Sequence, residues 1–94
     1  MRTIERSSAF KRDYKRVNAT PRHSKDLDSL VSAVVALLLV DNPLPDSNRD
    51  HPLTGDWAGY RECHIKPDLL LIYRKSDEET LRLARLGSHS ELFG

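Results

Sequence analysis

Residues 60–86, YRECHIKPDLLLIYRKSDEETLRLARL, decide the fold, because two polar turns divide them into three stretches with the composition of β-strands. In the first stretch, Tyr60 to Lys66, side chains alternate between two faces. One face carries Arg61, Cys63 and Ile65, and the other carries Glu62 and His64. The second stretch, Leu69 to Arg74, is a continuous apolar run typical of a central strand. The third stretch runs from Thr80 to Leu86. It is expected to end at Gly87, which a short tail follows.

Two helices are predicted ahead of these strands. The first begins after Ser7 or Ser8, which can cap it, and ends at Thr20-Pro21. Its inward positions are Phe10, Tyr14 and Val17. The second helix, with Ser24 as its expected N-cap, has a continuous apolar stripe at helical spacing. That stripe consists of Leu27, Leu30, Val31, Val34, Val35 and Leu38.

The remaining segments complete one domain. Arg2 to Arg6 is short enough for an edge strand, and Pro43 to Asp56 is an irregular connection with a brief strand expected at Leu53-Thr54. Long loops inside a compact domain are often functional. The order β-α-α-β-β-β over residues 1–94 predicts an α+β domain, a meandering antiparallel sheet with both helices packed on one face.

Composition limits the classes of function. The single cysteine, Cys63, cannot form an internal disulfide, and no spacing of Cys and His typical of zinc sites is present. The charged N-terminus does not resemble a secretory signal, and the longest apolar stretch, Leu30 to Val40, is too short to cross a bilayer. We therefore expect a soluble protein of the cytoplasm that contacts no membrane and needs no cofactor.

Charge is unevenly distributed along the chain, although the net charge is only +1. Residues 1–25 carry eight Lys or Arg and two Asp or Glu, whereas residues 26–60 carry Arg49 alone against six Asp. Such a basic segment is what a surface that meets phosphate requires. If charge were the only evidence, a helix face exposed to solvent would be the simpler explanation of these basic residues. The exposed basic positions of the first helix are Lys11, Arg12, Lys15 and Arg16.

Four polar residues outside the helices are candidates for chemistry. His51 lies in the long connection, His64 on the first hairpin strand, Asp68 in the next turn and His89 in the tail. Each has an ordinary structural explanation when taken singly. Their expected positions, however, converge at one end of the sheet.

Histidines that converge beside a carboxylate suit RNA cleavage without metal. A base takes the 2′-hydroxyl proton, an acid protonates the departing 5′-oxygen, and a cation stabilises the phosphorane. The candidate cations are Arg61, Arg82 and Arg85, while Phe93 or Trp57 can stack on a base. For Trp57 we favour packing under the loop. Metal binding by the same histidines is a rival interpretation, but no pair has the i, i+4 spacing of helical ligands.

The same residues also carry a family resemblance, because the second half of the chain resembles the YafQ branch of RelE-type bacterial toxins in order and spacing. The matching residues are Asp50-His51-Pro52-Leu53-Thr54-Gly55, Trp57, Gly59-Tyr60-Arg61, His64, Pro67-Asp68, Leu71-Ile72-Tyr73, Arg85-Leu86-Gly87-Ser88-His89 and Leu92-Phe93. The N-terminal half agrees only in its pattern of elements. The fold expected from the residues is also the RelE-like fold.

The resemblance implies an endoribonuclease that cuts messenger RNA in the decoding site of the ribosome and leaves a 2′,3′-cyclic phosphate. The catalytic residues that it implies are His51, His64, Asp68, His89 and the assisting Arg85, with Phe93 as the terminal aromatic. From the residues themselves we also expect Arg61 and the basic positions Lys11, Arg12, Lys15 and Arg16 to contact RNA. Two departures affect this expectation. Leu69 follows Asp68, whereas members of the family can have tryptophan at that position. A side chain that could stack or pack at the site is therefore missing, which affects the expected codon preference more than the expected activity. Strict alternation also points Arg85 toward the core, so a bulge must turn it outward.

The resemblance also implies a partner, an antitoxin of the ribbon-helix-helix type whose acidic tail wraps the toxin. Operator DNA would be bound only through that complex. Two alternatives remain open on sequence alone. One is a ParE-like inhibitor of DNA gyrase, which does not need the histidines, and the other is a non-catalytic module that binds RNA or protein.

Overall fold

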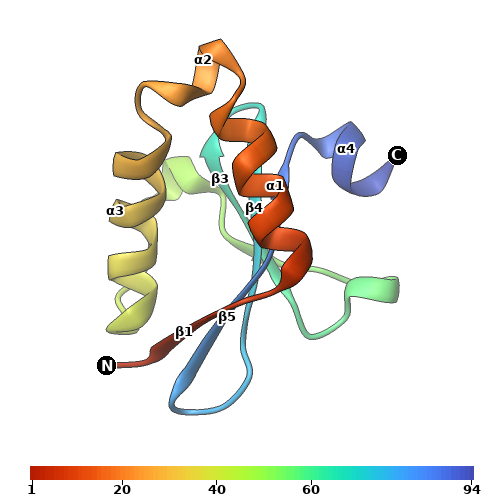
Figure 1. Ribbon diagram of the computed structural model, residues 1–94. Coiled ribbons are helices and arrows are strands. Elements are labelled where there is room, and N and C mark those ends of the chain that lie inside the picture. The colour runs from red at the N-terminus through yellow and green to blue at the C-terminus, as the bar shows by residue number, and fades with distance from the viewer.

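The computed structural model describes residues 1–94 and has a mixed α+β architecture (Figure 1). Its strands are β1 (Thr3–Arg6), β2 (His51–Pro52), β3 (Arg61–Lys66), β4 (Leu69–Lys75) and β5 (Thr80–Gly87). Its helices are α1 (Ser8–Asn18), α2 (Pro21–Ser24), α3 (Leu27–Leu39) and α4 (His89–Phe93), with single 3-10 turns η1 (Asp46–Asn48) and η2 (Gly55–Trp57). No helix has the length and apolar character needed to cross a membrane.

The five strands form one sheet in the order β1-β5-β4-β3-β2. The expected antiparallel meander is present as β3, β4 and β5, and β2 extends it in antiparallel pairing with β3. The first strand pairs in parallel with β5, so that Ile4 lies beside Leu81. The chain leaves the sheet after β1, passes through α1, α2 and α3, and re-enters it at β2.

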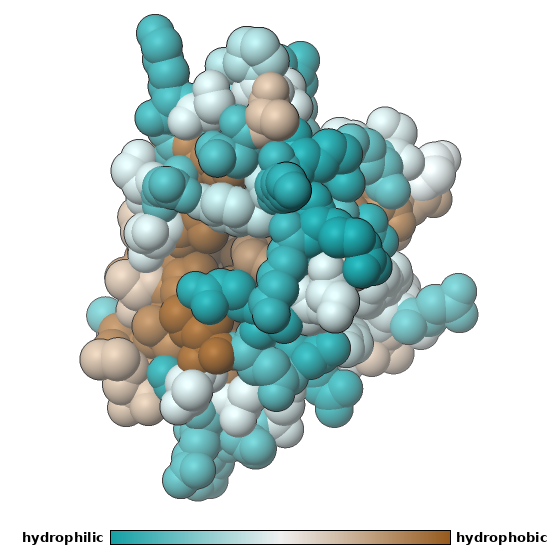
Figure 2. Space-filling view, in the orientation of Figure 1, coloured by the Kyte–Doolittle hydropathy of each residue, from teal (hydrophilic) through white to brown (hydrophobic).

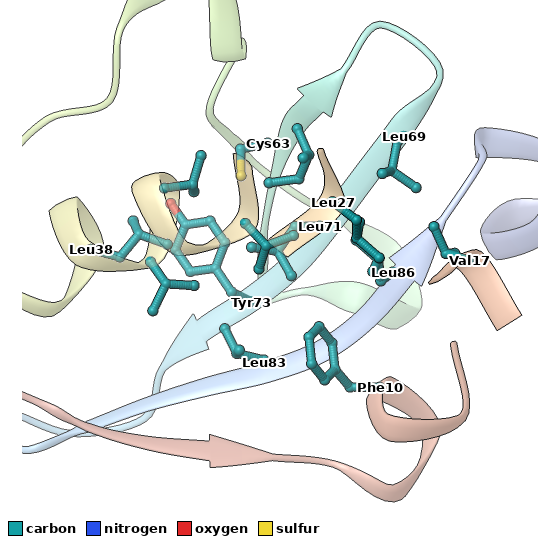
Figure 3. Packing of buried hydrophobic residues seen from close by; sticks show 14 of the residues in the cluster. Phe10, Val17, Leu27, Leu38, Cys63, Leu69, Leu71, Tyr73, Leu83 and Leu86 are labelled. Atoms are coloured by element: carbon teal, nitrogen blue, oxygen red, sulfur yellow. The ribbon is translucent and has the colours of Figure 1, made fainter. Parts of the chain in front are cut away.

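Two apolar clusters lie on opposite faces of the sheet, and β4 contributes to both. Leu69, Leu71 and Tyr73 face the larger cluster with α1 and α3 (Figure 3). Leu70 and Ile72 face a smaller one with Leu92 of α4. Because both faces are covered, every position from residue 69 to 73 is buried. This explains the continuous apolar run that predicted a central strand.

The first helix follows the predicted pattern. Ser7 is its N-cap and accepts a hydrogen bond from the Phe10 amide at 2.9 Å. Phe10 and Val17 are buried and Tyr14 packs against their cluster. Thr20-Pro21 ends the helix as expected, and the proline occupies the first turn of α2.

The predicted N-cap of the next long helix was wrong. Ser24 ends the separate one-turn helix α2, and α3 begins three residues later at Leu27, with Asp26 at its N-cap. Asp26 is held by Lys66 of β3, whose Nζ lies 2.8 Å from the Asp26 carboxylate. This contact between distant segments fixes the start of α3 where local sequence does not.

Two shorter elements also differ from expectation. The brief strand predicted at Leu53-Thr54 instead lies at His51–Pro52, where His51 pairs with Glu62 and Pro52 with Arg61. The tail after Gly87 is helical, because Ser88 and Glu91 form a reciprocal capping box at the start of α4. Both differences place histidines on ordered elements.

Candidate active site

Two adjoining hollows lie on the face of the sheet that carries α4. One, of about 300 Å³, is lined by His51, Leu53, Thr54, Trp57, Glu62, His89 and Phe93. The other, of about 440 Å³, is lined by Glu62, His64, Pro67, Asp68, Leu70, Ser88, His89 and Ser90. They share Glu62 and His89. The structure thus brings together the three predicted histidines and the predicted aspartate.

Alternation along β3 delivers two side chains to these hollows. Cys63 and Ile65 point into the large cluster, so Glu62 and His64 point to the opposite face, as predicted. The pairing of His51 with Glu62 across β2 and β3 then puts the His51 imidazole beside the carboxylate. Because Cys63 and Ile65 are anchored in the core, they fix the positions of Glu62 and His64 on the opposite face of β3.

Glu62 is a site residue that the sequence analysis did not single out. Its side chain is 8% exposed, and its Oε2 lies 3.1 Å from Nε2 of His51. The other oxygen, Oε1, is buried without a hydrogen-bond partner. Its expected position on the same face as His64 was the available signal, since a carboxylate placed beside a candidate histidine is a functional pairing.

The contacts of His51 determine where its protons lie. Nδ1 is 2.7 Å from the carbonyl oxygen of Arg49, which can only accept, so Nδ1 carries a proton. Nε2 then faces the Glu62 carboxylate, and two bare lone pairs at that distance would repel. A proton on Nε2 would let His51 donate a hydrogen bond to Oε2 of Glu62.

His89 occupies the first position of α4, directly after the Ser88 cap. Its ring centroid is 5.1 Å from that of Phe93, one helical turn later. Phe93 is 37% exposed, which leaves its ring accessible from the hollow. Trp57 packs edge-on against Tyr60 with centroids 5.2 Å apart, in agreement with the predicted packing role.

Asp68 lies in the turn between β3 and β4 and forms an ion pair with Arg22 of α2. This pairing joins the turn to the helical layer. The neighbouring His23, to which the sequence analysis gave no role, is buried and lines neither hollow. Burial lowers the pKa of the His23 imidazole, so burial favours its neutral form.

Arg85 lies at a bulge in the pairing of β4 with β5, where Ile72 pairs with Arg85 but Tyr73 pairs with Leu83. Its guanidinium, however, does not line the hollows. It binds the buried carboxylate of Asp13, with Nε–Oδ2 2.6 Å and Nη2–Oδ1 3.2 Å. This pairing raises the pKa of Arg85 and engages the cation that was expected to hold phosphate.

Arg61 is engaged in a similar way. Its Nε and Nη2 lie 3.2 and 3.3 Å from the two oxygens of Asp50, which also accepts a hydrogen bond from the Tyr73 hydroxyl at 2.5 Å. Burial raises the pKa of that phenol, so it stays a donor. The cluster fixes the residue immediately before His51 and leaves Arg61 partly exposed at 42%.

The basic residues of α1 lie on the other side of the molecule. Lys11, Arg12 and Lys15 are exposed on the helix that covers the large cluster, away from the hollows. Arg16 differs from them because it binds Asp13 and Glu91. Nowhere do three or more His, Cys, Asp or Glu side chains gather in a way that could hold a metal ion.

Comparison with known proteins gives one consistent result. A sequence model described as "Bacterial toxin of type II toxin-antitoxin system, YafQ" matches residues 2–94. The mRNA interferase toxin YafQ of Escherichia coli strain K12 is 43% identical over 93 residues, covering 99% of this chain and 97% of that protein.

Solved structures agree with the sequence match. A chain of the E. coli DinJ–YafQ complex superimposes with a TM-score of 0.83 at 40% identity, and the match covers 100% of this chain and 100% of that one. A metal-bound toxin from Helicobacter pylori gives a TM-score of 0.85 at 49% identity, covering 99% of this chain and 100% of that one. The similarity therefore extends over the fold and the sequence together.

Proposed function

This chain belongs to the YafQ family of bacterial toxins of type II toxin-antitoxin systems, and from that membership we propose that it is an endoribonuclease that cuts messenger RNA on the ribosome. The observation that carries the proposal is the gathering of three histidines and two carboxylates around two joined hollows. A gyrase inhibitor or a silent binding module would not need that arrangement of titratable groups. The family relatives named mRNA interferases support the same conclusion.

The reaction that we propose is transfer of the phosphodiester to the neighbouring 2′-oxygen. The 2′-oxygen attacks phosphorus while its proton passes to a base, and the bond from phosphorus to the 5′-oxygen breaks as an acid protonates that oxygen. The products are a 2′,3′-cyclic phosphate and a 5′-hydroxyl. Histidine suits both tasks because its ordinary pKa is near neutrality.

His64 and His89 are the two histidines of the site whose ring nitrogens have no protein partner, and we assign them as the acid and base pair. His51 has both nitrogens engaged, by the Arg49 carbonyl and by Glu62. These two contacts hold its ring in place at the wall of the hollow, and we assign it a positioning role instead. Asp68 orients the turn after His64, through its ion pair with Arg22, and Arg85 assists by holding the segment that leads to His89.

Ribosome dependence is supported by the placement of positive charge. The exposed residues Lys11, Arg12 and Lys15 have no acidic partner and lie on the opposite face from the hollows. A phosphate-rich surface can hold α1 electrostatically while the other face remains open to the message. Phe93, exposed at the hollow, is positioned to stack on a base of the RNA.

The partner that we propose is an antitoxin with an acidic tail and an apolar helix or strand. An apolar groove of about 430 Å³ runs between α1 and α3, with Phe10, Tyr14, Val31 and Val35 in its lining (Figure 2). Lys11 stands on its rim, where an acidic segment would meet it. A ribbon-helix-helix partner would bring operator DNA to the complex, and the toxin would act in the cytoplasm.

The test is cleavage of a defined messenger RNA by purified protein on programmed bacterial ribosomes, with a metal chelator present. We expect cuts in the decoding site, and His89→Gln to slow them by about a hundredfold or more, as for loss of a general acid or base. Glu62→Gln should slow them by about tenfold, because it removes the negative charge that holds the His51 proton. Arg74→Gln is the control, because Arg74 lines neither hollow.

Two outcomes would contradict the proposal. Undiminished cleavage by a folded His89→Gln protein would remove His89 from the chemistry. No cleavage by the folded wild-type protein, together with inhibition of DNA gyrase supercoiling, would instead identify the chain as a gyrase-directed toxin.

A further inference from the structure

The two hollows of the proposed active site contain no lysine or arginine. Their linings include the carboxylates of Glu62 and Asp68 but none of the fifteen Lys and Arg side chains. Arg61 and Arg85, the cations expected there, bind Asp50 and Asp13. An RNA backbone carries one negative charge per phosphate, so its neighbouring phosphates need cations from outside these hollows.

A third hollow, of about 470 Å³, adjoins them and shares His64 and Pro67 with the second. It forms where β2 stops short of the end of β3, so that η1 and the residues after it flank the open edge of β3. The Asn48 side-chain amide donates to the His64 carbonyl at 2.7 Å and ties η1 to that edge. No carboxylate lines this hollow.

Arg49 is the uncommitted cation of the third hollow. Its side chain is exposed and takes part in no ion pair or hydrogen bond of the structure, in contrast to Lys66, whose Nζ binds Asp26 and the Arg22 carbonyl. The backbone of Arg49 is nevertheless fixed, because it ends η1 in the left-handed region (φ 48°) and its carbonyl holds His51. The guanidinium therefore starts from an anchored position.

The alternative neighbouring hollow lacks a free cation. It adjoins the second hollow at Asp68 and Ser88 and is lined by Arg16 and Arg22. Arg22 binds Asp68, and Arg16 binds Asp13 and Glu91. A phosphate placed there would have to displace carboxylates, whereas one placed beside Arg49 displaces only water.

We propose that the third hollow is a phosphate subsite, in which Arg49 binds the phosphodiester adjacent to the one that is cut. The inference rests on the proposed ribonuclease function and adds the path of the RNA, from the hollow of His51 and His89, past His64, to Arg49. The fork of the guanidinium matches the two non-bridging oxygens of a phosphodiester, and the Ser47 hydroxyl can donate a further hydrogen bond to one of them. One residue thus orients His51 through its carbonyl and holds RNA through its side chain.

The experiment measures binding of short single-stranded RNAs that carry a 2′-O-methyl group at the cleavage position and so cannot be cut. One RNA has all its phosphates, and two others carry a neutral methylphosphonate at the linkage on either side of the scissile one. Dissociation constants are measured at several salt concentrations for wild type, Arg49→Gln and Arg6→Gln. Arg6 is a matched control, because it is exposed, unpaired and located on β1 at the opposite edge of the sheet.

We expect Arg49→Gln to weaken binding about tenfold for RNAs of any base sequence, and to reduce the salt slope by about 0.7 for one lost phosphate contact. One of the two neutral linkages should weaken wild-type binding by a similar factor and leave Arg49→Gln unaffected. Equal melting temperatures of the variants exclude unfolding as the cause. Arg6→Gln should retain the wild-type response to both linkages.

The subsite is wrong if Arg49→Gln weakens RNA binding no more than Arg6→Gln does, or if the wild type binds none of these RNAs. It is also wrong if each neutral linkage weakens binding of Arg49→Gln by the same factor as it weakens binding of the wild type. These outcomes are separable from failure of the proposed function. Cleavage on ribosomes that requires His89 would still stand without a subsite at Arg49.

Discussion

At the scale of single residues, Asp13 has the contacts that determine how the end of β5 is held. It is buried at 3% exposure on a helix whose exposed residues include Lys11, Arg12, Lys15 and Arg16. Its carboxylate accepts hydrogen bonds from Arg85, from Arg16 and from the Leu86 amide, which lies beyond the point where β1 pairs with β5. Asp13 of α1 thus provides the hydrogen-bond acceptor that a neighbouring strand would otherwise offer to the Leu86 amide.

Replacing Asp13 tests this role through pH. Burial alone would raise the pKa of Asp13, but the hydrogen bonds from Arg85, Leu86 and Arg16 outweigh it and hold the pKa below its usual 3.8. A depressed folded-state pKa gives stability that is present above the unfolded value, near pH 4, and is lost as the pH falls through the folded value. We expect Asp13→Asn to lower the free energy of unfolding by about 2–3 kcal/mol at pH 7.

Urea unfolding between pH 2.5 and 7 provides the measurement, with the exposed Asp56→Asn as the control. The difference between wild type and Asp13→Asn should shrink below about pH 4 as Asp13 itself takes up a proton. A difference that stays constant down to the lowest pH would mean that the carboxylate charge contributes nothing.

At the scale of elements, α4 is the one α-helix that carries a proposed catalytic residue. It has five residues and depends on its capping box and on Leu92, which packs in the smaller cluster. Such a short helix has little stability of its own. Its cap therefore controls the position of His89 more than it controls global folding.

Two serine N-caps allow this idea to be tested by matched changes. Ser88→Ala should increase amide hydrogen exchange across α4 and slow RNA cleavage about tenfold, with a loss of at most about 1 kcal/mol in global stability. Ser7→Ala, at α1, should cost about 1–2 kcal/mol globally, because Ser7 also donates to the Ala84 carbonyl at 2.7 Å. Equal effects of the two changes on global stability would show that α4 folds as part of the core.

Local periodicity predicted the elements that bury large apolar surfaces. The hairpin strands and the stripe of α3 follow from side-chain alternation and helical spacing. What it could not supply were features set by contacts between distant segments. The start of α3 depends on Lys66, and the parallel pairing of β1 depends on where β5 lies. The two-residue β2 is too short to have a periodicity.

The same distinction applies to the candidate site. His51, His64, Asp68 and His89 were predicted because their expected positions converge at one end of the sheet and because the family pattern includes them. Glu62 was missed as a partner of His51, since its importance appears only when β2 pairs with β3. All three candidate arginines, Arg61, Arg82 and Arg85, bind acids that sequence spacing could not associate with them, namely Asp50, Glu5 and Asp13.

At the scale of the whole molecule, the sheet separates two surfaces with different tasks. The groove between α1 and α3 lies on one face and the hollows lined by the histidines lie on the other. Charge changes on one face should therefore leave the other unaffected, since screening limits their reach to about 8–10 Å at physiological salt.

This separation predicts that Lys11→Glu weakens binding of the antitoxin about tenfold in dilute buffer, and less as salt is raised, because it reverses a charge on the groove rim. Arg74→Glu, on the face opposite α1 and α3, should leave the complex unchanged. Titration calorimetry at two salt concentrations would measure both. Equal weakening by the two variants would indicate that the antitoxin reaches around the sheet or responds only to net charge.

The alternation of β4 has a practical consequence for laboratory evolution. Leu70, Ile72 and Ala84 form the layer beneath the hollows, whereas Leu71, Tyr73 and Leu83 belong to the helical side. A combinatorial library confined to the first three positions would sample new codon preferences while the antidote still recognises its target. A library confined to Leu71 and Leu83 would alter immunity and spare the chemistry, whereas Tyr73 stays fixed because its hydroxyl binds Asp50 beside His51. The two faces of β4 and β5 can thus be varied separately.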